Sequence, residues 1–211
     1  MSEASILTVY NYPNKMGRIV LLAMEEVLGR SGINAVLSRA DLSPLINSYP
    51  PNNLDLLFNF QDMSKIQSAL EDLYGPLGGR GLALRSGRTA FKYGLREFGA
   101  LLGITDLAFR LLPLNEKLRT GLRAFANAFN SFSDQRVRLE EAPDCIYWHI
   151  ERCPVCWGRH TDRPTCDLAV GILQEALQWV SSGKHFLVEE THCIAQGDPT
   201  CTIVIEKRPV E

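Results

Sequence analysis

The six cysteines of this chain are the residues whose type and spacing most plainly could do chemistry, and all lie in its last third. Cys153 and Cys156 form a CxxC pair, Cys166 lies at an expected helix start, and Cys193 and Cys201 bracket an expected hairpin turn. Zinc favours four sulfur or nitrogen ligands in a tetrahedron and tolerates a carboxylate. We therefore expect some of these cysteines to bind a structural metal ion, zinc.

Spacing alone leaves the ligand set open. Glu190, His192, His160 and the CxxC pair all compete to join Cys166, Cys193 and Cys201. The cysteines could instead be buried free thiols that pack as small hydrophobic groups. A redox role for the CxxC pair is disfavoured, because no thioredoxin-like βαβ pattern surrounds it.

Other catalytic signatures find little support, and no catalytic residue is assigned. The glycine cluster GPLGGRG at 75–81 has the wrong spacing for a dinucleotide-binding loop and follows no strand, so we interpret it as a turn. None of the four histidines belongs to a recognisable nucleophile motif. An enzyme that transfers hydride would need a cofactor site, and the sequence shows none.

The bulk composition excludes several classes of protein. The 211 residues are 45% hydrophobic and 22% charged, with a formal net charge of −2, which is typical of an ordinary soluble globular protein. Direct nucleic-acid binding gets no electrostatic support, and no apolar stretch is long enough to span a bilayer. Without a secretory signal, we expect a cytoplasmic protein whose cysteines are thiols or metal ligands.

The front of the chain is predicted to be helical. Apolar residues recur at spacings of three and four, which indicates helices over residues 16–28, 34–39, 64–74, 87–102 and 115–132. The stripe on 16–28 ends at Gly29 and predicts either core packing or a dimer seam. Aromatic and aliphatic residues of the later helices, with one from a strand, could line an apolar pocket, although they would equally make a helical core. The candidate pocket residues are Phe91, Leu95, Phe98, Phe125, Phe129 and Trp148.

After residue 133 the hydrophobic pattern changes to a period of two. Strands are predicted over 136–141, 145–153, 186–194 and 201–207, with a helix over 166–182 and a turn between the last two strands. We predict one α+β domain over residues 1–211. Its mainly helical part, 1–135, packs on an antiparallel sheet, 136–211, that carries the metal-binding hairpin.

The tail from Cys166 to Ile205 resembles the 4-vinyl-reductase domain family, a small-molecule (hydrocarbon) binding domain also found in aromatic-sensing transcriptional activators. The resemblance rests on Cys166 followed by Gly171, on the run Glu190-Thr-His-Cys193, and on Gly197-Asp-Pro-Thr-Cys201 with the strand after it. Weaker matches, MEEVLG and GRTAFKYGLREFG, extend it over nearly the whole chain.

This resemblance implies a zinc site made by Cys166, Glu190, Cys193 and Cys201. Glu190 and Cys193 would point to opposite faces of a regular strand, so both can bind one ion only if the strand bulges or ends near His192. If the strand stays regular, His192 takes the place of Glu190. Cys153 and Cys156 are additional to the pattern and could join this site, hold a second metal ion, or bind none.

The resemblance also implies a fold related to trafficking-complex subunits and a homodimer through the N-terminal helix. The expected function is that of a cytoplasmic, zinc-containing sensor or carrier of a small hydrophobic ligand, aromatic or tetrapyrrole. The alternative is an accessory protein or reductase that acts on the 4-vinyl group of a chlorophyll-type tetrapyrrole. Four protein ligands leave zinc no open position for a substrate, which favours a structural ion.

Overall fold

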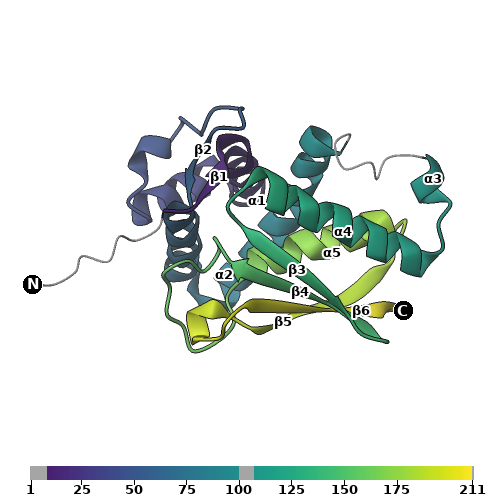
Figure 1. The fold of residues 1–211 in the computed structure, drawn as a ribbon. Helices are drawn as coiled ribbons and strands as arrows, with labels where there is room; N and C mark the ends of the chain where they lie inside the picture. The colour runs from purple at the N-terminus through teal and green to yellow at the C-terminus, as the bar shows by residue number, and fades with distance from the viewer. Residues whose placement is uncertain (1–8, 100–106, 211) are drawn as a thin grey trace, which may run out of the picture.

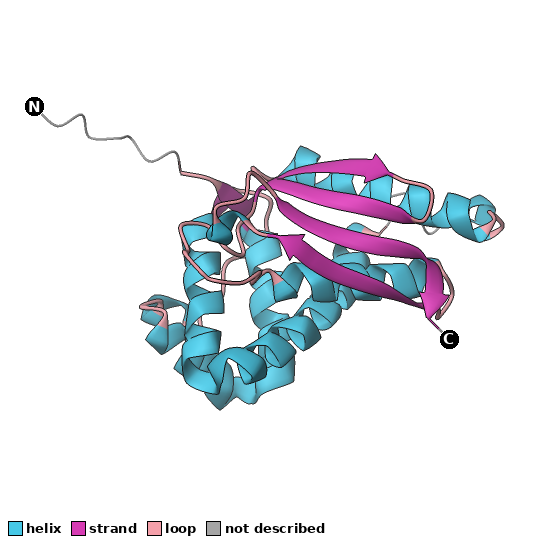
Figure 2. Ribbon diagram, turned by 90° about the horizontal axis from the view of Figure 1, so that it is seen from below, coloured by secondary structure: helices cyan, strands magenta, loops and turns pink. Residues whose placement is uncertain are grey.

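The computed structural model describes residues 9–99 and 107–210. These residues form a layer of helices and an antiparallel sheet, so the predicted α+β class is confirmed (Figure 1). The helices cover one face of the four-stranded sheet and leave its other face open (Figure 2). None of the described helices is long and apolar enough to cross a membrane.

Two long, bent helices build the front half. α1 (Asn14–Arg39) and α2 (Phe60–Phe98) each pass through one glycine with a positive φ of 72°, Gly29 and Gly75. Glycine adopts this conformation without steric cost. A small sheet joins the starts of both helices, since β1 (Asn11–Pro13) pairs antiparallel with β2 (Leu56–Asn59). A short 3₁₀ helix (Ser43–Leu45) lies between them.

The predicted breaks in these helices are only partly right. Gly29 interrupts α1 as expected, but the helix resumes at once and reaches Arg39. The interpretation of residues 75–81 as a turn is wrong beyond Gly75, because the chain is helical again from Pro76. Proline suits the first position of a helix, where its missing N–H costs nothing. Residues 100–102 of the predicted helix over 87–102 lie outside the described residues.

The second half agrees closely with the predicted strands and helices. α3 (Leu107–Arg110) and α4 (Leu114–Phe132) lead into the main sheet. Its strands are β3 (Arg136–Glu141), β4 (Cys145–Arg152), β5 (His185–His192) and β6 (Cys201–Val210), in the spatial order β3-β4-β6-β5. α5 (Asp167–Val180) follows β4 in the chain and packs on the sheet with α4, and a 3₁₀ turn (Ile194–Gln196) precedes β6.

Alternation along β4 directs its side chains to different surroundings. Ile146, Trp148 and Ile150 are buried under the helices, whereas Tyr147 and His149 lie on the sheet's other face.

The apolar stripe of α1 is buried in the chain's own core, with Ala23 and Met24 fully buried. Of the two interpretations of that stripe, core packing is the one the fold displays.

α2 crosses α5 at two glycines. A Cβ atom on Gly87 would lie 2.2 Å from the carbonyl oxygen of Leu168, and one on Gly171 would lie 2.1 Å from that of Leu84. The two helix backbones therefore touch, as only glycine permits. This crossing fixes the start of α5, and with it Cys166, against α2.

Candidate metal centre and ligand cavity

Five of the six cysteines gather at one end of the sheet. They come from the loop after β4, from the residue before α5, and from the β5–β6 turn, which meet there (Figure 1). All five residues are fully buried. The Sγ atoms of Cys153 and Cys166 are 3.5 Å apart, and those of Cys156 and Cys201 are 3.4 Å apart. The Sγ atom of Cys166 lies 3.8 Å from that of Cys193 and 3.6 Å from that of Cys201.

Two sets of four residues among the described part of the chain could each hold a metal ion. Within each set, the ligand atoms lie within 4.8 Å of one another. One set is Cys166, Glu190, Cys193 and Cys201, the quartet that the family resemblance implies. The other set is Cys153, Cys156, Cys166 and Cys201. The cluster therefore brings the CxxC pair beside the expected quartet.

Glu190 reaches the cluster because β5 is irregular at its end. The pairing register with β6 shifts between Glu190 and His192, and the strand ends at His192. A bulge or a strand end at this place was the condition for Glu190 to share a site with Cys193, and β5 meets it. His192 is exposed and belongs to neither set of four.

The carboxyl group of Glu190 has the surroundings of a metal ligand. Its Oε2 accepts a 2.7 Å hydrogen bond from the backbone N–H of Cys166, while its buried Oε1 has no hydrogen-bond partner. Burial, with the nearby Cys193 thiol, raises the pKa of Glu190 to about 9. A carboxylate at this position needs a positive charge nearby, which a bound cation would supply. The residues present thus fit a zinc ion.

Backbone contacts hold the segments that carry the thiols. The N–H of Cys193 donates to Asp198 Oδ2 at 2.8 Å, and the N–H of Ile194 donates to the Cys201 sulfur at 3.4 Å. The loop after β4 is tied to the β5–β6 turn, because the N–H of Thr161 donates to the Ala195 carbonyl at 2.9 Å.

Glu71 on α2 fixes the far end of that loop. Its Oε1 accepts hydrogen bonds from Arg159 at 2.8 Å and from Thr165 at 2.7 Å. The remaining candidates lie apart from the cluster: His160 is exposed on this loop, and Cys145 opens β4 outside both sets.

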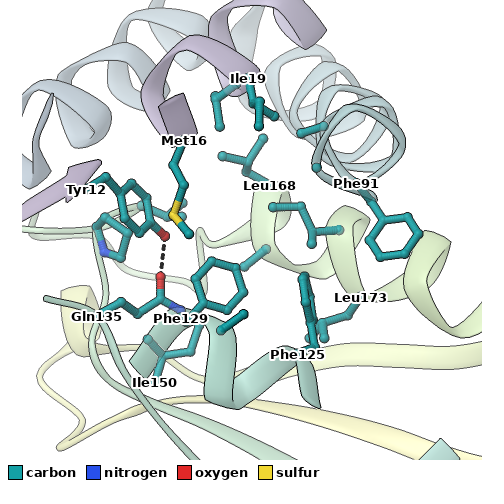
Figure 3. A pocket seen from close by; sticks show the side chains of 18 of the residues that line it. Tyr12, Met16, Ile19, Phe91, Phe125, Phe129, Gln135, Ile150, Leu168 and Leu173 are labelled. Atoms are coloured by element: carbon teal, nitrogen blue, oxygen red, sulfur yellow. Dashed lines mark hydrogen bonds between the residues drawn. The ribbon is translucent and has the colours of Figure 1, made fainter. Parts of the chain in front are cut away.

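An apolar cavity lies between the helices and the inner face of the sheet (Figure 3). It has an empty volume of about 1000 Å³, mouth included, which is within the size range of small-molecule sites. All six candidate pocket residues line it: Phe91, Leu95, Phe98, Phe125, Phe129 and Trp148.

The cavity wall contains one polar pair. The Tyr12 hydroxyl donates a short hydrogen bond to Gln135 Oε1 (Figure 3). Burial raises the pKa of Tyr12 well above its ordinary value, so the hydroxyl stays protonated. Among the described residues that line the cavity, none is charged and none is a histidine.

Sequence reasoning missed this pair and several aliphatic wall residues. Met16, Ile19 and Ile172 lie on stripes that the sequence assigned to helices, so their helical phase was a usable signal. Tyr12 and Gln135 are 123 residues apart and lie outside any helix, so nothing local links them.

The cavity and the thiol cluster share one wall. Cys153, Pro154 and Val155 line the cavity, and Cys153 is also a member of the cluster. Leu168 lines the cavity two residues after Cys166. Any ion that holds these residues would also fix part of the cavity's surface.

Comparison with known proteins supports the resemblance seen in the sequence. Residues 146–207 match the family model of the 4-vinyl-reductase domain, which confirms the resemblance for that segment. No curated protein matches the chain.

Several solved structures have a similar fold. An Fe(II) unliganded H-NOX protein from K. algicida has a TM-score of 0.57 and 12% identity, with coverage of 94% of this chain and 97% of that chain. An H-NOX protein from S. oneidensis in the Fe(II)NO ligation state has a TM-score of 0.55 and 13% identity, over 92% and 99%. A structure from a study of heme distortion in the H-NOX family has a TM-score of 0.54 and 14% identity, over 94% and 97%. At these identities the likeness concerns the fold alone.

Proposed function

We propose that this chain is a cytoplasmic, zinc-containing protein that binds a small hydrophobic molecule and serves as its sensor or carrier. The observation that carries the proposal is the apolar cavity between helices and sheet, whose wall continues into the thiol cluster. The 4-vinyl-reductase domain match over residues 146–207 and the H-NOX-like fold agree with a small-molecule binding domain.

The cavity favours an aromatic ligand with one polar group. Its wall is aromatic and aliphatic, and Tyr12 and Gln135 offer one site for a hydroxyl or carbonyl group. Such walls, with a few placed polar groups, are typical of small-molecule sites. A phenol-sized molecule would bury its ring against Phe129 and meet the polar pair with its oxygen.

A tetrapyrrole is the second candidate, and the alternative function as an accessory protein in 4-vinyl reduction goes with it. Its carboxylates would have to stay outside the uncharged wall, and Lys15, whose ammonium lies 5.6 Å from the ring centre of Phe98, is a cation beside the cavity. Histidine is a frequent axial ligand of haem iron, and none lines this cavity among the described residues. The wall thus favours the aromatic ligand over haem.

The zinc in this proposal is structural. Cys166, Glu190, Cys193 and Cys201 would fill four coordination positions and leave none for a substrate. Zinc binding contributes to folding, because a preformed site rarely exists in the unfolded chain. The ion would hold the β5–β6 turn to the start of α5 and so keep the cavity wall in place.

Native mass spectrometry of the purified protein tests the proposal, because it reports bound zinc, any retained ligand, and the proposed homodimer through the N-terminal helix together. A titration with phenol, toluene and a porphyrin, followed by Trp148 fluorescence, then compares ligand classes. We expect saturable binding of phenol, which Gln135→Leu weakens roughly 10-fold through the lost hydrogen bond. Gln178→Leu, away from the cavity, is the matched control. Absence of saturable binding by all three probes would contradict the proposal.

A further inference from the structure

The two sets of potential ligands in the cluster overlap in a regular way. Both contain Cys166 and Cys201, and each adds two ligands of its own. The added pairs have the same spacing, since Cys153 and Cys156 are three residues apart, as are Glu190 and Cys193. Two ligands three residues apart are a usual chelating pair in zinc sites.

The sulfur positions already have the dimensions of zinc tetrahedra. With zinc–sulfur bonds of about 2.3 Å, the edge of a regular tetrahedron is about 3.8 Å. The Sγ–Sγ distances in the cluster run from 3.4 Å, between Cys156 and Cys201, to 3.8 Å, between Cys193 and Cys201. The edge common to both sets, between Cys166 and Cys201, measures 3.6 Å.

We infer that the cluster is a binuclear zinc centre in which the Cys166 and Cys201 thiolates bridge two ions. Cys153 and Cys156 complete the tetrahedron of one ion, and Glu190 and Cys193 complete that of the other. Two zinc tetrahedra that share this edge place their ions about 3 Å apart. The inference rests on the proposed zinc site and adds a second ion to it.

Charge and burial give an independent reason for the second ion. A single ion on the Glu190 quartet leaves Cys153 and Cys156 as two fully buried thiols without a ligand role, 3.5 Å and 3.4 Å from sulfurs bound to zinc. Two ions use every sulfur and carboxylate of the cluster. Four positive charges then oppose six negative ones, and bridging thiolates are shared rather than left uncompensated.

The test begins with the number of zinc ions per wild-type chain, measured by native mass spectrometry and by elemental analysis. We expect two ions per chain, and X-ray absorption should show a zinc–zinc distance of about 3 Å. The double variant Cys153→Ser, Cys156→Ser should retain one ion. Cys145→Ser, which removes the one thiol outside the cluster, is the matched control and should retain two.

The outcomes separate this inference from the proposed function. One ion per wild-type chain, unchanged in the double variant, would overturn the binuclear centre and leave the single zinc site standing. No zinc in the wild type would overturn both. Iron with acid-labile sulfide in place of zinc would also contradict the inference. The wild-type measurements decide the matter even if the double variant does not fold.

Discussion

At the scale of single residues, Glu190 shows how one side chain can be prepared for a cation. One carboxylate oxygen is held by the N–H of Cys166, and the other is buried without a partner. A buried, unpaired carboxylate is costly, and its raised pKa expresses that cost. Ion binding would remove the cost, so Glu190 should contribute to metal affinity more than an exposed acidic residue.

Glu190→Gln therefore should lower zinc affinity, measured by competition with a chelating dye, by roughly 10-fold or more, since even outer-shell partners of metal ligands are worth 10–100-fold. The substituted amide keeps the shape of the side chain but not its charge. His192→Asn is the control and should leave the affinity unchanged, because His192 is exposed and outside both sets. The reverse result would show that His192 completes the site.

The spacing of the cysteines predicted a metal site but could not choose its members. Glu190 and His192 are two residues apart, and only the register shift near the end of β5 decides which one turns inward. That shift depends on pairing with β6, which a single strand's sequence does not display. The same holds for Tyr12 and Gln135, whose contact joins distant segments.

At the scale of elements, the crossing of α2 and α5 governs where both sites lie. Gly87 and Gly171 allow the two backbones to touch, and this contact places the start of α5 beside the thiol cluster and Leu168 against the cavity. The sequence predicted both helices from their apolar spacing. It did not predict the crossing, because a glycine within a helix signals close approach only once its partner is known.

Gly87→Ala should lower the free energy of unfolding by about 1–3 kcal/mol, because its Cβ would overlap the Leu168 carbonyl oxygen and push the helices apart. Urea unfolding followed by circular dichroism measures the change. Gly81→Ala on the same helix meets no atom within 4 Å and should instead stabilise by about 0.5–1 kcal/mol. Equal effects of the two substitutions would refute the close crossing.

The glycine-rich segment at 75–81 shows the limit of composition as a guide to helices. Glycine disfavours a helix by roughly 1 kcal/mol per residue, so a turn is the natural local prediction. In the fold, Gly75 alone leaves helical geometry, and Gly79 lies against Glu71, where a Cβ would be 2.8 Å from the Glu71 Cα. Tertiary packing outweighs local preference here.

At the scale of the whole molecule, one segment belongs to both sites. Residues 153–155 line the cavity and begin with a cluster cysteine. A metal ion that fixes this segment changes the surface that a ligand meets. Thermodynamic linkage then requires that ligand binding change metal affinity by the same factor.

Zinc-depleted protein should therefore bind phenol more weakly than zinc-loaded protein, by roughly 5-fold or more. Isothermal titration of both forms measures the ratio, and zinc titration with and without phenol should return the same factor. The Cys145→Ser variant controls for thiol chemistry outside the cluster. Identical phenol affinities in both forms would mean that the shared segment keeps its shape without metal.

The complete burial of the five cluster cysteines has a further consequence, in time rather than in affinity. Water and competing ligands reach the sulfurs only when the surrounding segments open locally, and such openings are far rarer than side-chain motions. The residence time of an ion is then set by how often the loop held by Glu71 and the β5–β6 turn separate. Metal loss from this protein would thus act as a clock for one local unfolding event.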